Sequence, residues 1–133
     1  MVTISTFESA TKFSPGTALI EKIGTPYYIA PEVLEKSYGP KCDVWSLGVI
    51  CYICLYAKAP FEGSNDEEIM ESVKEGHLNL TRNSKQSYTV SNQAKDFLKW
   101  MLDIDENERP SAEEALGHPW LKSFNADVNK ESA

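Results

Sequence analysis

The stretch from Asp43 to Tyr56 constrains the fold more than any other part of this 133-residue chain. After Asp43 it carries no charge, and its apolar residues fall on every side of a helical wheel. A surface helix shows a polar face, so a helix of this composition belongs in the interior of a domain. Its valines and isoleucines also suit a buried strand, but the length of the run favours a helix. The sequence therefore predicts a central buried helix onto which other helices pack.

Composition limits the kinds of partner and location that are expected. Apolar residues make up 41% of the chain, which is enough to build a core. The formal net charge of −7 argues against nucleic acid and anionic membrane as partners, because both attract basic surfaces. The apolar run is shorter than the ~20 residues of a membrane span, and the N-terminus shows no signal-peptide pattern. We therefore expect a soluble, cytoplasmic protein.

Three further helices are predicted from capping residues followed by apolar periodicity. The segment 65–76 opens with asparagine and an acidic turn and ends on glycine. Ser91 precedes apolar residues at helical spacing, which are Ala94, Phe97, Leu98, Met101 and Leu102. Ser111 and Glu114 form a capping box for the last helix, which is expected to bury Leu116.

Four short motifs occur in a fixed order along the chain. They read Gly-Thr-Pro-Tyr-Tyr-Ile-Ala-Pro-Glu at 24–32, Asp-Val-Trp-Ser-Leu-Gly-Val at 43–49, Glu-Arg-Pro at 108–110 and His-Pro-Trp at 118–120. Their order and spacing resemble the C-terminal, helical lobe of eukaryotic serine/threonine protein kinases. Their wording is similar to that of the calcium-dependent protein kinases, within the calcium/calmodulin-dependent group. The fold expected from this resemblance is a mainly α C-terminal lobe of the protein-kinase fold, truncated and without the N-terminal β lobe.

The resemblance divides the chain into three parts and implies a partner. Residues 1–23 resemble an activation segment, residues 24–124 resemble the large-lobe helical subdomain, and residues 125–133 are expected to form a frayed tail. In the family, the loop at the start of the second part lines the pocket for the residue after the phosphoacceptor. Its residues here are Gly24, Thr25, Pro26, Tyr27 and Tyr28. The residues alone favour an ordinary loop over an apolar surface, whereas the resemblance favours docking of a protein or peptide substrate.

Four residues are expected to act as structural anchors. The resemblance pairs Glu32 with Arg109, and such a bidentate pair would fix the docking loop to the helical core. Two unrelated surface charges are the alternative. Asp43 is interpreted as the N-cap of the central helix, and in the family this position also anchors the catalytic loop. Trp45 is expected to anchor the core.

The N-terminal part departs from the family pattern. Counted back from Gly24 without a gap, Thr6, Phe7 and Glu8 fall where the family has Asp-Phe-Gly, whose aspartate holds Mg²⁺. A threonine hydroxyl is a weak ligand for Mg²⁺, so we interpret these residues as a degenerate metal motif, with a slipped alignment as the alternative. The candidate hydroxyls for activation-loop phosphorylation are Ser14, Thr17 and Thr25.

No catalytic or metal-binding residue is assigned. The sequence contains neither a Gly-x-Gly-x-x-Gly loop nor a His-Arg-Asp catalytic loop. Cys51 and Cys54 have only two distant histidines as further metal ligands, so buried apolar thiols are the favoured interpretation. We expect no cofactor for this chain, although the intact family uses ATP and Mg²⁺ for phosphoryl transfer. Three hypotheses remain: part of an active kinase that also needs the missing N-terminal lobe, a pseudokinase, or a stand-alone helical interaction module.

Overall fold

The computed structural model describes residues 3–22, 24–81 and 89–124, and within them it is helical. The elements are η1 (Pro26–Tyr28), α1 (Pro31–Leu34), α2 (Lys41–Tyr56), α3 (Asp66–Glu75), α4 (Asn92–Met101) and α5 (Ala112–Leu116). The described ranges hold no β-strand, and Leu19 and Tyr38 form an isolated antiparallel bridge. The mainly α prediction is confirmed. The tail at 125–133, predicted to fray, lies outside the described residues.

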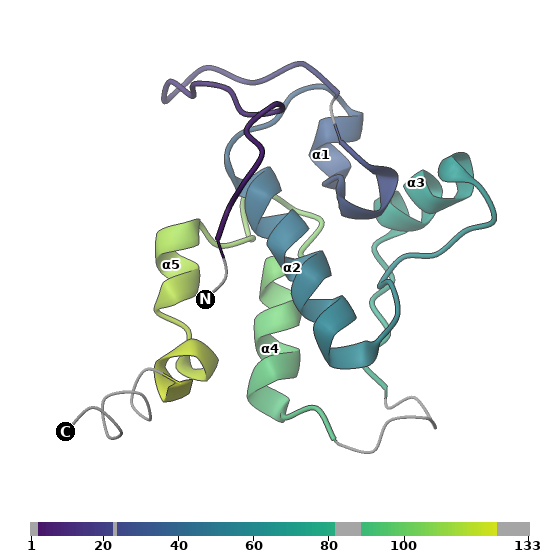
Figure 1. Ribbon diagram of the computed structural model, residues 1–133, viewed down its shortest axis with the longest axis vertical. Helices are drawn as coiled ribbons and strands as arrows, with labels where there is room; N and C mark the ends of the chain where they lie inside the picture. Colours follow the sequence, from purple (N-terminus) through teal and green to yellow (C-terminus); the bar gives the residue numbers. More distant parts are fainter. Residues whose placement is uncertain (1–2, 23, 82–88, 125–133) are drawn as a thin grey trace.

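Helix α2 runs through the middle of the molecule and lies beside α4 (Figure 1). It begins at Lys41, two residues earlier than expected, and ends at Tyr56, after which Ala57 adopts a left-handed conformation with φ of 56°. One side of the helix is fully buried in the main core, including Trp45 and Val49. The predicted role of this helix as the centre of a helical core is therefore confirmed.

The prediction that α2 is buried on every side is wrong for one face. Leu47 and Ile50 are 54% and 48% exposed, and Cys54 is also exposed. With Asp43, which is exposed as well, these residues recur at intervals of four, three and four, so they share one side of the helix. When a helix is apolar on every side, its sequence does not show which side the neighbouring elements cover. Within the described ranges, the core packs against the opposite side.

The contact between α2 and α4 is close because of Gly48. A β-carbon at this position would lie 3.0 Å from side-chain atoms of both Met101 and Leu102. Helix α4 starts at the predicted cap, where the Ser91 hydroxyl accepts the Ala94 N–H at 3.1 Å. Its five predicted apolar positions are all buried. The apolar face of α4 is thus fixed against the backbone of α2.

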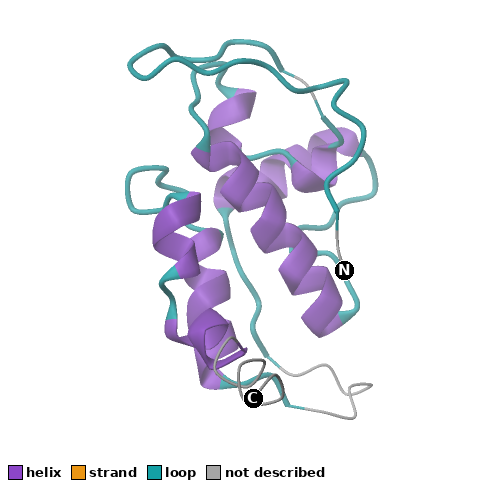
Figure 2. Cartoon of the chain, turned by 60° about the vertical axis from the view of Figure 1, so that its left-hand side comes forward, coloured by secondary structure: helices purple, strands orange, loops and turns teal. Residues whose placement is uncertain are grey.

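Helix α3 has the caps that the sequence predicts. Asn65 accepts the N–H of Glu68 at 2.9 Å, and Gly76 ends the helix with φ of 66°. Ile69 and Val73 face the core, while most of the charged residues face outward. Figure 2 shows the helices joined by loops, and the main buried cluster contains side chains of α1, α2, α3 and α4.

The C-terminal region packs on α4 through aromatic rings. Ser111 and Glu114 form the predicted capping box of α5. The prediction that Leu116 is buried is wrong, because α5 is one short turn and Ala115 alone among its residues is buried. Helical structure resumes at 119–124, and the ring of Trp120 lies 5.2 Å from that of Phe97. In the described part of the chain, no helix has the length and apolarity needed to cross a membrane.

Candidate docking segment and its anchor

Glu32 and Arg109, which are 77 positions apart, form a buried bidentate pair. Arg109 Nη1 lies 2.5 Å from Glu32 Oε1, and Nη2 lies 2.9 Å from Oε2. Arg109 is fully buried, and Glu32 is 8% exposed. The structure thus brings these two predicted anchors together, one at the start of α1 and the other just before α5. A buried bidentate pair is strongly directional, and removal of either partner leaves the other as an unpaired buried charge.

Backbone carbonyls and an aromatic ring complete the surroundings of the arginine. Nε and Nη2 donate to the Asp103 carbonyl at 3.0 and 2.9 Å, and Nη1 donates to the Lys41 carbonyl at 3.1 Å. The guanidinium carbon also lies 5.0 Å from the centre of the Trp45 ring. Together with the two bonds to Glu32, these contacts use all five guanidinium donors. Arg109 therefore joins α1, the start of α2 and the loop after α4.

The candidate docking segment, residues 24–28, lies just before Glu32 in the chain. Gly24 has φ of 132°, a conformation that suits glycine, and the Tyr28 N–H bonds to the Thr25 carbonyl at 3.0 Å. Tyr27 and Tyr28 remain exposed at 39% and 38%, whereas Ile29 just after them is buried. The segment thus presents two aromatic rings to solvent while the chain on its C-terminal side is fixed in the core.

Ser46 is a contact of the docking segment that sequence reasoning did not identify. Its hydroxyl lies 2.7 Å from the Tyr28 carbonyl, and the Cys42 carbonyl lies 3.2 Å away as a second acceptor. The bond joins the first half of α2 to the exposed tyrosines. Ser46 is a small polar residue within the uncharged run that follows Asp43, and that mismatch was the signal available in the sequence.

The interpretation of Asp43 as an N-cap is wrong. Pro40 is the N-cap residue, with no side-chain cap, and Asp43 lies in the first turn of α2. Helix α2 starts earlier than the apolar run, so the aspartate stands where it can favour the helix dipole but cannot cap. The neighbouring Cys42 thiol lies 3.8 Å from its Oδ1. Burial, followed by the nearby Asp43 charge, raises the pKa of Cys42 to about 12.

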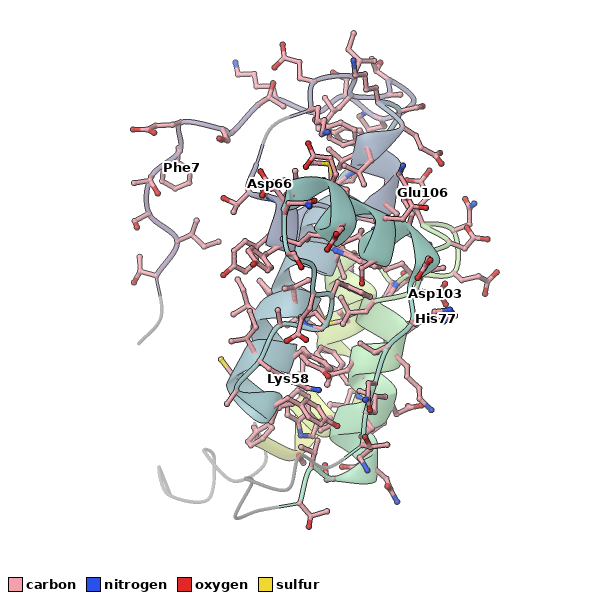
Figure 3. All side chains as sticks on the ribbon, turned by 90° about the vertical axis from the view of Figure 1, so that its right-hand side faces the viewer. Phe7, Lys58, Asp66, His77, Asp103 and Glu106 are labelled. Atoms are coloured by element: carbon pink, nitrogen blue, oxygen red, sulfur yellow. The ribbon has the colours of Figure 1, made fainter. Side chains whose placement is uncertain are left out.

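The predicted degenerate metal motif consists of Thr6, Phe7 and Glu8. All three are exposed, on an arm that stands away from the helices (Figure 3). The Thr6 hydroxyl bonds to the Ser5 carbonyl at 2.6 Å. In the ranges that the structure describes, no cluster of three or more His, Cys, Asp or Glu side chains is placed to hold a metal ion. Thr6 offers a hydroxyl where Mg²⁺ prefers a carboxylate, and the interpretation of these residues as a degenerate metal motif stays a prediction.

The three candidate phosphorylation sites are exposed hydroxyls. Ser14 and Thr17 belong to one turn, in which the Thr17 N–H bonds to the Ser14 carbonyl at 3.1 Å. Thr25 precedes η1 without capping it through its side chain. Their exposure gives a modifying enzyme access to each, and it does not distinguish among them.

A central buried helix and a buried pair of Glu32 and Arg109 agree with the kinase-lobe arrangement that the sequence motifs predicted. The chain belongs to the protein kinase family, because the protein kinase domain matches residues 1–121. The fold is accordingly the helical C-terminal lobe, and its resemblance to serine/threonine kinases of the calcium-dependent group is confirmed.

Curated relatives carry the same group name. Calcium-dependent protein kinase 22 of Oryza sativa subsp. japonica is 48% identical over 115 residues, which is 86% of this chain and 19% of the rice protein. Calcium-dependent protein kinase 3 of Plasmodium yoelii yoelii is 49% identical over 111 residues, or 80% of this chain and 20% of the relative. Calcium-dependent protein kinase 25 of Arabidopsis thaliana is 46% identical over 108 residues, with shares of 81% and 20%. The chain thus spans about a fifth of the length of these relatives.

Proposed function

We propose that this chain supplies the substrate-docking segment and helical core of a calcium-dependent-kinase-like serine/threonine kinase. In the intact family, this lobe holds a protein substrate while ATP and Mg²⁺ are positioned by other residues. The 133-residue chain by itself does not transfer phosphate. Its partners are a protein or peptide substrate and the remainder of a kinase domain, in the cytoplasm.

The observation that carries this proposal is the anchored docking segment. The buried pair of Glu32 and Arg109 fixes its C-terminal side, and Ser46 holds the Tyr28 carbonyl. Tyr27 and Tyr28 stay exposed, so their rings are available to a peptide. Pre-organised contact surface of this kind lowers the entropy lost on binding.

The exposed face of α2 supports a partner that completes the kinase domain. Leu47, Ile50 and Cys54 form an apolar strip on a helix whose other side is the centre of the core. Exposed contiguous apolar surface commonly marks an interface. The proposal assigns this strip to contact with the remainder of a kinase domain.

A chimera tests the proposal directly. In the rice relative, the part that matches residues 24–115 is replaced by these residues of this chain, so that the segment before the docking residues stays that of the rice protein. Phosphorylation of a generic serine peptide is then measured. We expect activity within about tenfold of the parent kinase, and we expect the same chimera with Glu32→Gln to lose most of it. A folded chimera that binds ATP but does not phosphorylate the peptide would contradict the proposal.

The isolated chain gives the complementary measurement. Its melting temperature is compared with and without millimolar ATP and Mg²⁺, and no saturable shift is expected. A nucleotide-dependent rise of several degrees would show that the chain binds ATP alone, because ligands stabilise the state that binds them.

Pseudokinase function is a second candidate, favoured by the residues at the Asp-Phe-Gly position. Thr6 offers no carboxylate there, and the arm that carries it is exposed. The chimera distinguishes the two cases when it includes residue 6. Activity that appears only after Thr6→Asp would identify a pseudokinase, whereas activity of the unaltered chimera excludes that role.

A stand-alone interaction module is the third candidate, favoured by α3. Its outward face carries exposed carboxylates, including Asp66, Glu67 and Glu71. An inactive chimera that Thr6→Asp does not rescue would favour this role.

A further inference from the structure

A shallow groove of about 740 Å³ lies between α4, the loop after it and α5. Helices α4 and α5 are neighbours in Figure 1 and share one buried cluster. The groove combines an aromatic wall, a buried histidine and carboxylates, and the proposed kinase role uses none of them. Its lining residues are Asp96, Lys99, Trp100, Asp103, Glu114, Gly117, His118 and Pro119.

The buried histidine fixes the direction of one carboxylate. His118 is 6% exposed, and its Nε2 lies 3.1 Å from Asp96 Oδ2. The Trp120 N–H donates to His118 Nδ1 at 3.1 Å, so Nδ1 is an acceptor and carries no proton. The proton is therefore on Nε2, and this N–H donates a hydrogen bond to the Asp96 carboxylate. A neutral imidazole orients the Asp96 carboxylate without neutralising its charge.

Two other carboxylates of the groove are also held in place. Glu114 accepts the Ser111 N–H at 2.7 Å in the capping box, and Asp103 Oδ1 accepts the Asp105 N–H at 3.0 Å. Lys99 is the one cation among the lining residues. Each of these carboxylates already has a hydrogen-bond partner, so a cationic ligand meets groups whose directions are partly set.

The aromatic wall selects among cations. Trp100 is half-buried, and its ring centre lies 5.8 Å from that of His118. A guanidinium is planar, stacks on an indole face and bonds a carboxylate through two N–H groups. A lysine ammonium offers the charge without the planar fork. The pairing of Trp100 with an oriented Asp96 therefore matches arginine.

We propose that this groove binds an arginine side chain presented by a basic peptide segment of a partner protein. The guanidinium stacks on Trp100 and donates to the free lone pairs of the Asp96 carboxylate. The site is separate from the docking tyrosines and does not depend on the proposed kinase role.

The test is an NMR titration of the full chain with a blocked Gly-Arg-Gly-Arg-Gly peptide at low salt. The chain has three tryptophans, so their indole N–H signals act as separate reporters. We expect saturable shifts of the Trp100 signal that exceed those of Trp45 and Trp120. The same peptide with citrulline for arginine, which keeps the shape and removes the charge, should leave Trp100 unshifted. This comparison uses the unaltered protein and needs no variant to fold.

Two variants that each remove one negative charge distinguish binding in the groove from general attraction to an acidic chain. Asp96→Asn keeps an oxygen to accept from His118, and Glu71→Gln removes one exposed charge on α3. We expect Asp96→Asn to weaken peptide binding at least about fivefold and Glu71→Gln less than about twofold. Equal effects of the two variants, equal shifts with the citrulline peptide, or no shift at Trp100 would each overturn the proposal.

Discussion

At the scale of single residues, a charge pair that is nearly inaccessible to water joins distant parts of the chain. Arg109 meets acceptors from three parts of the chain and lies over Trp45. The motifs at 24–32 and 108–110 were enough to predict its pairing with Glu32 through the family resemblance. They gave no indication that Arg109 would bond the Asp103 and Lys41 carbonyls. Every residue has a backbone carbonyl, so the sequence does not show which ones act as acceptors.

Substitution of Glu32 by glutamine should destabilise the chain strongly. The arginine would remain buried without its counter-charge, which costs about 3–5 kcal/mol. Urea unfolding followed by tryptophan fluorescence measures the loss in free energy of unfolding. Glu71→Gln is the control, because the Glu71–Lys74 pair is exposed and should contribute less than about 1 kcal/mol. Equal stability of the two variants would contradict the role of the buried pair.

The three cysteines should differ in reactivity towards an aromatic disulfide reagent at pH 8. Burial and Asp43 raise the pKa of Cys42 to about 12, and burial also raises the pKa of Cys51. The thiolate is the reactive form, so both should react slowly in the folded chain. Cys54 is exposed and should react first, although the sequence predicted a buried thiol. Peptide mapping after brief modification gives the order, and early labelling of Cys42 would contradict it.

At the scale of secondary-structure elements, the close approach of α2 and α4 depends on the absence of a side chain. Gly48→Ala would place a methyl group 3.0 Å from Met101 and Leu102. Overpacking of this kind costs about 1–3 kcal/mol, against a gain of up to about 1 kcal/mol in helix propensity. We expect a net loss of stability in urea unfolding. A variant more stable than the parent would show that α4 can move away freely.

The capping box of α5 should contribute to stability in a pH-dependent way. The backbone bond from Ser111, followed by its side-chain bond, lowers the pKa of Glu114 below its ordinary value. A lowered folded-state pKa adds stability above the unfolded pKa, which is lost as the pH falls through the folded pKa. Glu114→Gln should therefore lower the melting temperature near neutral pH and less at pH 3. A difference that grows towards pH 3 would contradict this assignment.

The elements were predictable where caps and periodicity agreed, and less so where they did not. Asn65, Ser91 and Ser111 each cap the helix expected of them. The start of α2 was misplaced because Pro40 and Lys41 carry no apolar signal. Leu116 was misassigned because α5 is one short turn that turns Ala115 towards the core and leaves Leu116 exposed.

At the scale of the whole molecule, the sequence indicated a central helix but not which of its sides is covered. Leu47 and Ile50 are as apolar as Val44 and Val49, yet one pair is exposed and the other is buried. The difference comes from where α4, η1 and the loops pack, which no local pattern records. The exposed strip and the groove beside His118 became visible only when distant segments were placed together.

Native-state hydrogen exchange of the full chain tests the central role of α2 most directly. Amides on its buried side, such as those of Val49 and Tyr52, should exchange only through global unfolding. Their free energies of opening should then equal the free energy of unfolding measured in urea and exceed those of η1 and α3. Exchange in α2 as fast as in η1 would contradict the account. A central helix should not open while the elements that pack on it stay folded.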